Sequence, residues 1–255
     1  MRIIISPAKQ MREERDFLAP RELPRFLPEA GRLLSALRAR SPAELQKLWK
    51  CNDAIAALNV ERLETMDLER NLTPALLAYV GIQYQTMAPR VLETAQYEFL
   101  QEHLRILSGF YGLLRPFDGV TPYRLEMGAR LAVDGCRDLY AFWGDRLGRA
   151  LAEEAGWVLD LASKEYSRAV LPHLSPWVRV VSCVFGELRP DGRVVEKGTL
   201  CKMARGEMVR WLAETGTVHP EDLPRFRGLG YRYDPARSQK DQLVFLKSNG
   251  HGSVT

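Results

Sequence analysis

Residues 104–131 read LRILSGFYGLLRPFDGVTPYRLEMGARL, and their composition is unusual within this chain. Apolar side chains alternate with charged ones, and glycine and proline recur along the whole stretch. Glycine and proline fix an irregular backbone path, because glycine allows special backbone angles and proline restricts them. Three interpretations follow from this pattern: a catalytic loop, an anion clamp, or a tightly folded corner of a globular domain.

Two arginines, Arg115 and Arg124, lie in this stretch, and a rigid path could hold them facing a common point. Two guanidinium groups together form a strong fork for a phosphate or a carboxylate. Tyr123 and Glu126 flank this region, and Glu126 is a candidate acid or base. The structural alternative is an ion pair, since Arg124 and Glu126 are two residues apart and would share one face of a strand.

The composition of the chain limits its class and its partners. The 255 residues are 46% hydrophobic and 27% charged, which is ordinary for a globular protein. The formal net charge is +4 and the pI is about 8.9. This mild basic bias permits nucleic acid or phosphorylated ligands as partners but does not require them.

Four cysteines and four histidines occur, and none of them has the spacing of a zinc site. We therefore predict reduced structural thiols, no metal site and no cofactor, although ligands from distant positions escape this test. The three consecutive isoleucines near the N-terminus are too short a run for a signal peptide. No stretch approaches the roughly 18 apolar residues of a membrane helix, so we expect a cytoplasmic protein with no membrane partner.

Predicted strands are scattered among predicted helices along the whole chain. The β-branched run at residues 2–5 predicts a buried strand, and further strands are expected at 157–163, on both sides of the Asp191–Gly192 turn, and at 229–248. Helical patterns cover the ranges 27–40, 95–107, 137–156 and 201–216. No linker or repeat divides the chain. We predict a single α+β domain over residues 1–255, with a mixed, curved sheet packed by helices and a flexible tail at 248–255.

Residues 41–63, SPAELQKLWKCNDAIAALNVERL, predict two helices joined by the short turn KCND. Ser41 fits the N-cap of the first helix, Pro42 its first helical position and Glu44 the third position of a capping box.

The segment ISPAK follows the first predicted strand and offers Ser6 and Lys9. A serine and a lysine can act as a nucleophile and its base, or they can form a turn that binds an anion. The second interpretation is the more usual one. The phosphate-binding pattern G-x-x-x-x-G-K is absent.

Two later segments add charged and aromatic side chains. LASKEY places Glu165 and Tyr166 after a predicted strand, with Ser163 in the position of a helix N-cap. LCKMARG places Lys202 and Arg205 three residues apart, so they share one face of the predicted helix. That face is either a solvated basic surface or a contact for phosphate groups.

The segments SPAK, LSGFYGLLRPFDGVTPYRLEMG, FWGD, LASKEY and KMARG occur in this order along the chain. With these motifs, the sequence resembles the YaaA family of bacterial peroxide stress resistance proteins over residues 1–247. The resemblance implies a cytoplasmic protein that protects against hydrogen peroxide by limiting free iron and the oxidative damage it causes. It also implies binding of double-stranded DNA and a single α+β domain containing a helix-hairpin-helix element. It implies no established reaction.

The two predicted helices of residues 41–63 are the best candidate for that element. A helix-hairpin-helix presents backbone N–H groups to phosphates, and Lys47, Lys50 and Asn52 would add contacts. The turn KCND lacks the two glycines of the usual pattern, so two ordinary packed helices remain an alternative.

Two functions therefore stay open. The first is binding of duplex DNA through phosphate contacts on the helical pair and around Lys202 and Arg205. The second is an enzyme acting on a nucleotide-like or phosphorylated small molecule, an anionic ligand whose proton Glu126 or Glu165 would move. The candidate pocket residues are Ser6, Lys9, Arg115, Tyr123, Arg124, Glu126, Glu165, Tyr166, Lys202 and Arg205.

Overall fold

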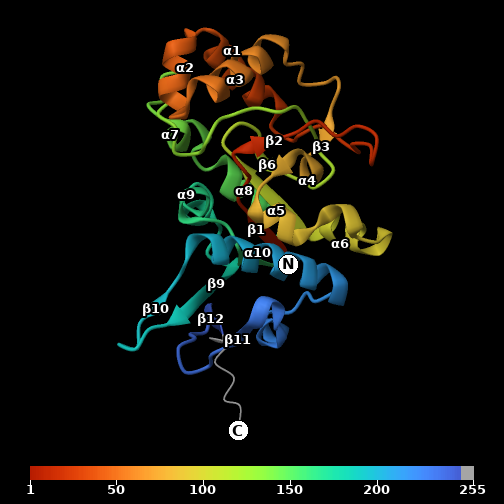
Figure 1. The fold of residues 1–255 in the computed structure, drawn as a ribbon, viewed down its shortest axis with the longest axis vertical. Coiled ribbons are helices and arrows are strands. Elements are labelled where there is room, and N and C mark those ends of the chain that lie inside the picture. Colours follow the sequence, from red (N-terminus) through yellow and green to blue (C-terminus); the bar gives the residue numbers. More distant parts are fainter. Residues whose placement is uncertain (248–255) are drawn as a thin grey trace.

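A mixed sheet of eight strands runs through the part of the chain that the computed structural model describes, residues 1–247 (Figure 1). The predicted flexible tail at 248–255 lies outside the described residues. The strands in chain order are β1 (Arg2–Ile5), β2 (Gln10–Met11), β3 (Thr73–Pro74), β4 (Tyr79–Val80), β5 (Leu104–Ser108), β6 (Gly112–Leu114), β7 (Gly119–Val120), β8 (Trp157–Asp160), β9 (Arg179–Leu188), β10 (Val194–Val195), β11 (Tyr231–Tyr233) and β12 (Gln242–Lys247).

The order of the strands in the large sheet is β11-β12-β9-β8-β1-β5-β6, and β10 pairs with β9. The five inner strands from β12 to β5 are parallel, whereas β6, β10 and β11 join antiparallel. Two separate two-stranded pairs, β2 with β4 and β3 with β7, complete the pairing of named strands among the described residues. The predicted α+β class with a mixed sheet packed by helices is confirmed.

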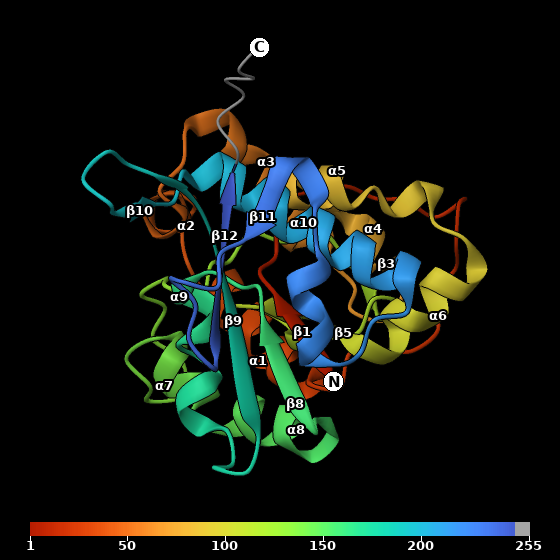
Figure 2. The ribbon, with the colours of Figure 1, turned by 90° about the horizontal axis from the view of Figure 1, so that it is seen from below.

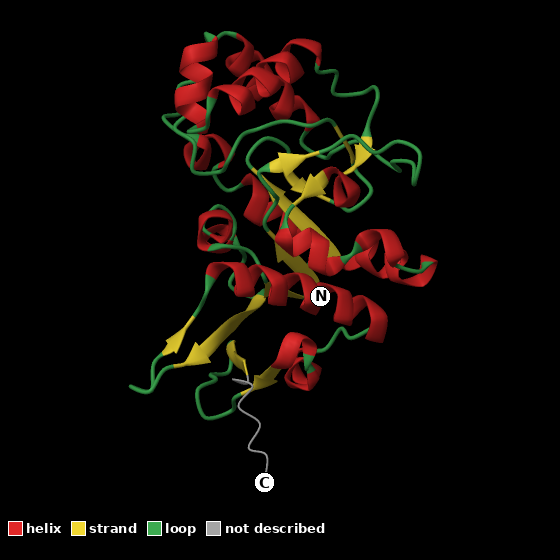
Figure 3. Ribbon diagram, in the orientation of Figure 1, coloured by secondary structure: helices red, strands yellow, loops and turns green. Residues whose placement is uncertain are grey.

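Helices make up most of the remaining regular structure. They are α1 (Leu27–Arg38), α2 (Pro42–Trp49), α3 (Asp53–Thr65), α4 (Ala75–Ala78), α5 (Ile82–Met87), α6 (Thr94–His103), α7 (Leu139–Trp143), α8 (Arg146–Glu154), α9 (Lys164–Ser167) and α10 (Gly198–Thr215). Short 3-10 turns cover Pro89–Val91, Leu171–His173, Pro220–Arg225 and Gly228–Gly230. Figure 3 shows α1, α2 and α3 as a helical group at one end of the molecule, and Figure 2 shows the strands β1, β8 and β9 side by side.

The predicted helix at 95–107 is wrong in its last four residues. The helix α6 ends at His103, and the next five residues form β5, which runs parallel to β1. All five residues of β5 are buried, including Arg105, whose guanidinium makes two hydrogen bonds of 2.8 and 2.5 Å to the Glu154 carboxylate. A strand covered on both faces reads as one continuous apolar run, so its sequence does not differ from that of a buried helix.

The predicted single helix at 137–156 is also wrong, because the chain breaks it into α7 and α8. Gly144 has a φ of 52° and its N–H closes α7 on the carbonyl of Tyr140. The second helix then ends at Glu154, two residues before the end of the predicted range, with Ala155 in the cap position. A left-handed backbone at Gly144 cannot continue an α-helix, which explains the break.

The predicted pair of helices in residues 41–63 is present as α2 and α3. Ser41 accepts a hydrogen bond from the backbone of Glu44, whose side chain in turn accepts one from the backbone of Ser41, so the capping box is confirmed. The predicted strands around the Asp191–Gly192 turn and at the end of the chain are also present, as β9 with β10 and β11 with β12.

The helix α10 packs unusually closely on α5. A Cβ atom added to Gly206 would lie 2.1 Å from the carbonyl oxygen of Gln83, so only glycine fits at this crossing. The same contact fixes the position of Lys202 and Arg205, which lie on α10 within one turn of Gly206.

We expect Gly206→Ala to lower the free energy of unfolding by about 1–3 kcal/mol, since the added methyl group must push α10 away from α5. The higher helix propensity of alanine, worth at most about 1 kcal/mol, opposes this loss. Equilibrium unfolding in urea measures the difference. Gly198→Ala is the matched control in the same helix, because its Cβ would meet nothing within 4 Å. Equal stability of the two variants would contradict the close contact.

Candidate functional site

The order of the strands creates a crevice beside β1. From β1 the chain proceeds to β5 on one side, and it later returns to place β8 on the other side of β1. In parallel sheets, ligands bind outside the carboxyl ends of the strands at such a switch in direction. Ser6 follows β1 and Ser163 lies three residues after β8, so both belong to this edge of the sheet.

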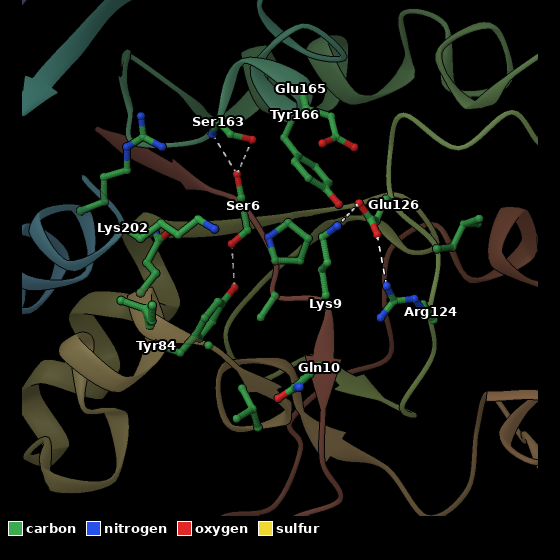
Figure 4. Close-up of a pocket in the computed structure, with 18 of the residues that line it drawn as sticks. Ser6, Lys9, Gln10, Tyr84, Arg124, Glu126, Ser163, Glu165, Tyr166 and Lys202 are labelled. Carbon is green, nitrogen blue, oxygen red and sulfur yellow. Dashed lines mark hydrogen bonds and ion pairs between the residues drawn. The ribbon is translucent and has the colours of Figure 1, made fainter. Parts of the chain in front are cut away.

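A hydrogen-bonded pair of serines joins the two loops at this edge. The Ser6 hydroxyl oxygen accepts a hydrogen bond of 2.8 Å from the backbone N–H of Ser163 and lies 3.2 Å from the Ser163 hydroxyl oxygen. Ser163 stands at the N-cap position of α9, as predicted, but its side chain does not cap the helix. The Tyr84 hydroxyl donates to the carbonyl of Ser6 at 3.0 Å, which ties α5 to the same loop (Figure 4).

A cavity of about 530 Å³ opens above this pair of serines. Five segments far apart in the sequence contribute its walls: the loop after β1, the start of α5, the irregular stretch before Met127, the start of α9, and α10. Its lining residues are Ser6, Pro7, Ala8, Lys9, Gln10, Val80, Gly81, Ile82, Gln83, Tyr84, Tyr123, Arg124, Leu125, Glu126, Ser163, Glu165, Tyr166, Lys202 and Arg205. Nine of the ten predicted pocket residues are among them, so the structure brings these nine together.

On one wall, Glu126 is shared by two cations. Its carboxylate lies 2.8 Å from the Lys9 ammonium and 3.6 Å from the Arg124 guanidinium (Figure 4). Lys9 therefore pairs with a carboxylate and not with Ser6, which leaves the alternative of a serine–lysine nucleophile without its required contact. Arg124 and Glu126 form the ion pair considered from the sequence, although the backbone there is irregular and not a strand.

The opposite wall is cationic, although the charge of Arg205 also acts on the buried Asp160 carboxyl, where it opposes the rise in pKa that burial causes. Lys202 and Arg205 project from α10, and within residues 1–247 neither has a carboxylate at ion-pair distance. The Nε atom of Arg205 is buried without a hydrogen-bond partner among the described residues. An unsatisfied buried donor costs free energy and calls for a functional explanation. With four basic and two acidic side chains, the whole lining carries a net charge of +2.

Three tyrosines, Tyr84, Tyr123 and Tyr166, also line the cavity. The Tyr123 hydroxyl lies 2.6 Å from the Ser108 hydroxyl at the end of β5 and 2.9 Å from the Tyr79 hydroxyl. Burial raises the pKa of Tyr84, Tyr123 and Tyr166 above the ordinary value for tyrosine. These groups are therefore neutral hydrogen-bonding groups at physiological pH.

The structure does not bring Arg115 to the cavity, so the expectation that Arg115 and Arg124 face a common point is wrong. Arg115 is instead paired with Glu22 at 3.2 Å on another face, beside a smaller cavity of about 250 Å³. Its backbone N–H donates to Asp118 at 2.9 Å. The turn that contains Pro116 and Asp118 reverses the chain between the two arginines, which sends their side chains to different surfaces.

The sequence analysis missed two residues that shape the cavity. Ser163 was assigned only to a helix cap, and Tyr84 was not among the candidate residues. The motif LASKEY carried a signal for Ser163, whereas nothing local marked Tyr84, whose role depends on the contact between α5 and the loop after β1.

Several known proteins are similar in sequence to this chain over nearly its whole length. A family model described as peroxide stress protein YaaA matches residues 1–237. A UPF0246 protein from Desulfitobacterium hafniense is 52% identical over 248 residues, which cover 97% of this chain and 98% of that relative. UPF0246 proteins from Lachnoclostridium phytofermentans and Agathobacter rectalis are 49% and 46% identical over 251 and 245 residues, covering 98% and 96% of this chain and 98% of each relative. The chain belongs to the YaaA family.

In this YaaA family member, the predicted DNA contacts of the helical pair lie at the turn between α2 and α3. Lys47 and Lys50 are exposed there. The side-chain oxygen of Asn52 accepts a hydrogen bond from the backbone of Ile55, so it caps α3. Residues 41–63 carry three basic and three acidic side chains, so this pair of helices has no net charge.

Two further properties of the described residues concern metals and membranes. Residues 1–247 contain no group of three or more histidine, cysteine, aspartate or glutamate side chains placed to hold a metal ion. Over the same range, no helix has both the length and the apolar character that a membrane crossing requires.

Burial raises the pKa of the Asp118 carboxyl to about 7, although the Arg115 backbone N–H and the charges of Arg115 and Arg105 oppose the shift. The folded state then binds one more proton than the unfolded state between about pH 4 and about pH 7, so stability falls as the pH rises through this window. We expect the free energy of unfolding to fall by about 2–3 kcal/mol more in the wild type than in Asp118→Asn between about pH 5 and about pH 8. Urea unfolding at both pH values measures this, and parallel behaviour would contradict it.

Proposed function

We propose that this chain protects cells in peroxide stress by binding double-stranded DNA, with the cationic cavity as the main contact for phosphate groups. The observation that carries the proposal is the pair Lys202 and Arg205, which have no ion-pair partner within residues 1–247. Unpaired cations on an exposed face attract phosphates and release counterions on binding.

The helical pair supports this contact from one side. The Arg124 guanidinium lies 3.5 Å from the carbonyl oxygen of Trp49, the last residue of α2. Lys50 follows directly and is exposed, so the turn of the helical pair adjoins the cavity. Because the pair has no net charge, we assign it a secondary role as a helix-hairpin-helix contact.

The limitation of iron-dependent damage is part of the proposal. We propose that it follows indirectly from the association with DNA, since the described residues group no set of ligands suited to a metal ion.

The buried thiols are poorly suited to reaction with peroxide. All four cysteines are free thiols, and burial raises the pKa of Cys201 to about 11 and raises that of Cys183 further. The thiolate is the reactive form, so these two groups are nearly unreactive at neutral pH. The proposed protection therefore does not depend on them.

A second candidate function is an enzyme acting on a nucleotide-like or phosphorylated small molecule. The observation in its favour is the position of the cavity, outside the carboxyl ends of parallel strands where small-molecule sites are usually found. Lys9, Arg124 and Lys202 would hold the anion. Glu126 or Glu165 would move a proton.

Fluorescence anisotropy of a short labelled duplex, titrated at several salt concentrations, tests the first proposal. We expect affinity to fall steeply with salt, and we expect Lys202→Ala and Arg205→Ala each to weaken binding about tenfold or more. Lys50→Ala should weaken it by less than about threefold, in line with an exposed phosphate contact.

Lys240→Ala is the matched control, since Lys240 is exposed in the connection between β11 and β12, far from the cavity in the sheet order. Absence of binding at low salt would overturn the DNA proposal. A loss confined to Lys50→Ala would move the DNA contact to the helical pair and leave the cavity to the second function.

A further inference from the structure

We infer that the cavity takes one nucleoside monophosphate unit in a single orientation, with the phosphate against α10 and the base edge against Glu165. This inference rests on the proposed function and names the ligand of the same site. It follows from an asymmetry of charge between the two ends of the cavity, which Figure 4 shows with Lys202 on one side and Glu126 with Glu165 on the other.

The α10 end has the donors of a phosphate subsite. Lys202 and Arg205 are without ion-pair partners among residues 1–247, and no acceptor in that range is hydrogen-bonded to the Arg205 guanidinium. The Ser163 hydroxyl lies at the same end, beside Ser6, and its own proton has no acceptor among the described residues. Two cations match the charge of one phosphate monoester, which is about −1.5 to −2 at neutral pH.

The opposite end has a free carboxylate. One oxygen of Glu165 accepts a hydrogen bond of 2.8 Å from the backbone N–H of Gly128, which fixes the side chain. No cation in residues 1–247 lies at ion-pair distance from Glu165, whereas Glu126 is already shared by Lys9 and Arg124. A fixed carboxylate of this kind accepts hydrogen bonds from N–H groups of a ligand.

The cavity also offers apolar contacts for the body of a nucleoside. Its lining includes the apolar side chains Pro7, Ala8, Ile82 and Leu125. A volume of about 530 Å³ is in the range of cavities that hold one small ligand. Among the common bases, guanine presents a ring N–H and an amino group on one edge, and both can donate to a single carboxylate. Guanosine monophosphate is therefore the ligand that the two ends together favour.

This nucleotide could be free, with a phosphate monoester that matches both cations, or part of a single nucleic acid strand, which offers the same base but a phosphodiester of charge about −1. Isothermal titration calorimetry with guanosine 5′-monophosphate is the first measurement. Guanosine, which lacks the phosphate, and adenosine 5′-monophosphate, which lacks the ring N–H, test the two ends separately. We expect both to bind about tenfold more weakly or worse.

Substitutions at each end of the cavity test that end separately, through the affinity for a different ligand. Arg205→Ala and the exposed Lys202→Ala should weaken guanosine monophosphate about tenfold while changing guanosine little. Glu165→Gln keeps an acceptor for Gly128 and should reduce the preference for guanosine monophosphate over adenosine monophosphate. Lys240→Ala should leave all three affinities unchanged.

The outcomes separate this inference from the DNA proposal. No heat of binding with millimolar guanosine monophosphate would overturn the inference, even where duplex binding shows its salt dependence. Equal binding of the guanine and adenine nucleotides, or no effect of either α10 variant, would overturn it as well. If guanosine monophosphate binds as expected, its affinity is compared with that of a single-stranded oligonucleotide that contains one guanine. Tighter binding of the nucleotide would indicate a free nucleotide as the natural ligand, and tighter binding of the oligonucleotide would indicate a nucleic acid strand.

Discussion

The hydrogen bond from the backbone N–H of Ser163 to the hydroxyl oxygen of Ser6 is the contact on which the whole site depends. It joins the loops that follow β1 and β8, which are adjacent parallel strands. The two serines are 157 positions apart in the sequence. Because this hydrogen bond holds the two loops together, Lys9 after β1 and Glu165 after β8 face the same cavity. The sheet thus determines the site through a single short link at its edge.

Sequence reasoning found most of the cavity because polar side chains at strand ends and on one helix face follow simple geometric rules. Ser6 after β1 and Lys202 with Arg205 on α10 are examples. It failed for Arg115, because a reversal at Asp118 decides where that side chain points, and the proline and glycine that mark the turn do not indicate which surface the side chain reaches. It also failed for β5, since full burial on both faces removes the alternation that identifies a strand. Both errors come from information that only tertiary contacts supply.

The distribution of charge distinguishes two surfaces, both of which the sequence alone indicates as candidates for DNA binding. The pair α2 and α3 balances its charges within residues 41–63, whereas the cavity lining keeps an excess of two positive charges. The excess lies at α10, because the cations of the other wall are engaged by Glu126. The electrostatic potential in the cavity is therefore more positive at α10 than at the other wall. This difference orients an anionic ligand before any close contact forms.

The backbone from Leu125 to Met127 lies against Gly109 so closely that a Cβ there would be 2.7 Å from the Leu125 carbonyl oxygen. This wall of the cavity has neither helix nor strand, yet Tyr123, Leu125 and Met127 are all buried. Burial of side chains and the close approach to Gly109 hold this segment in place, although it forms no helix or strand. In this protein, close packing fixes a segment that a map of helices and strands would leave out.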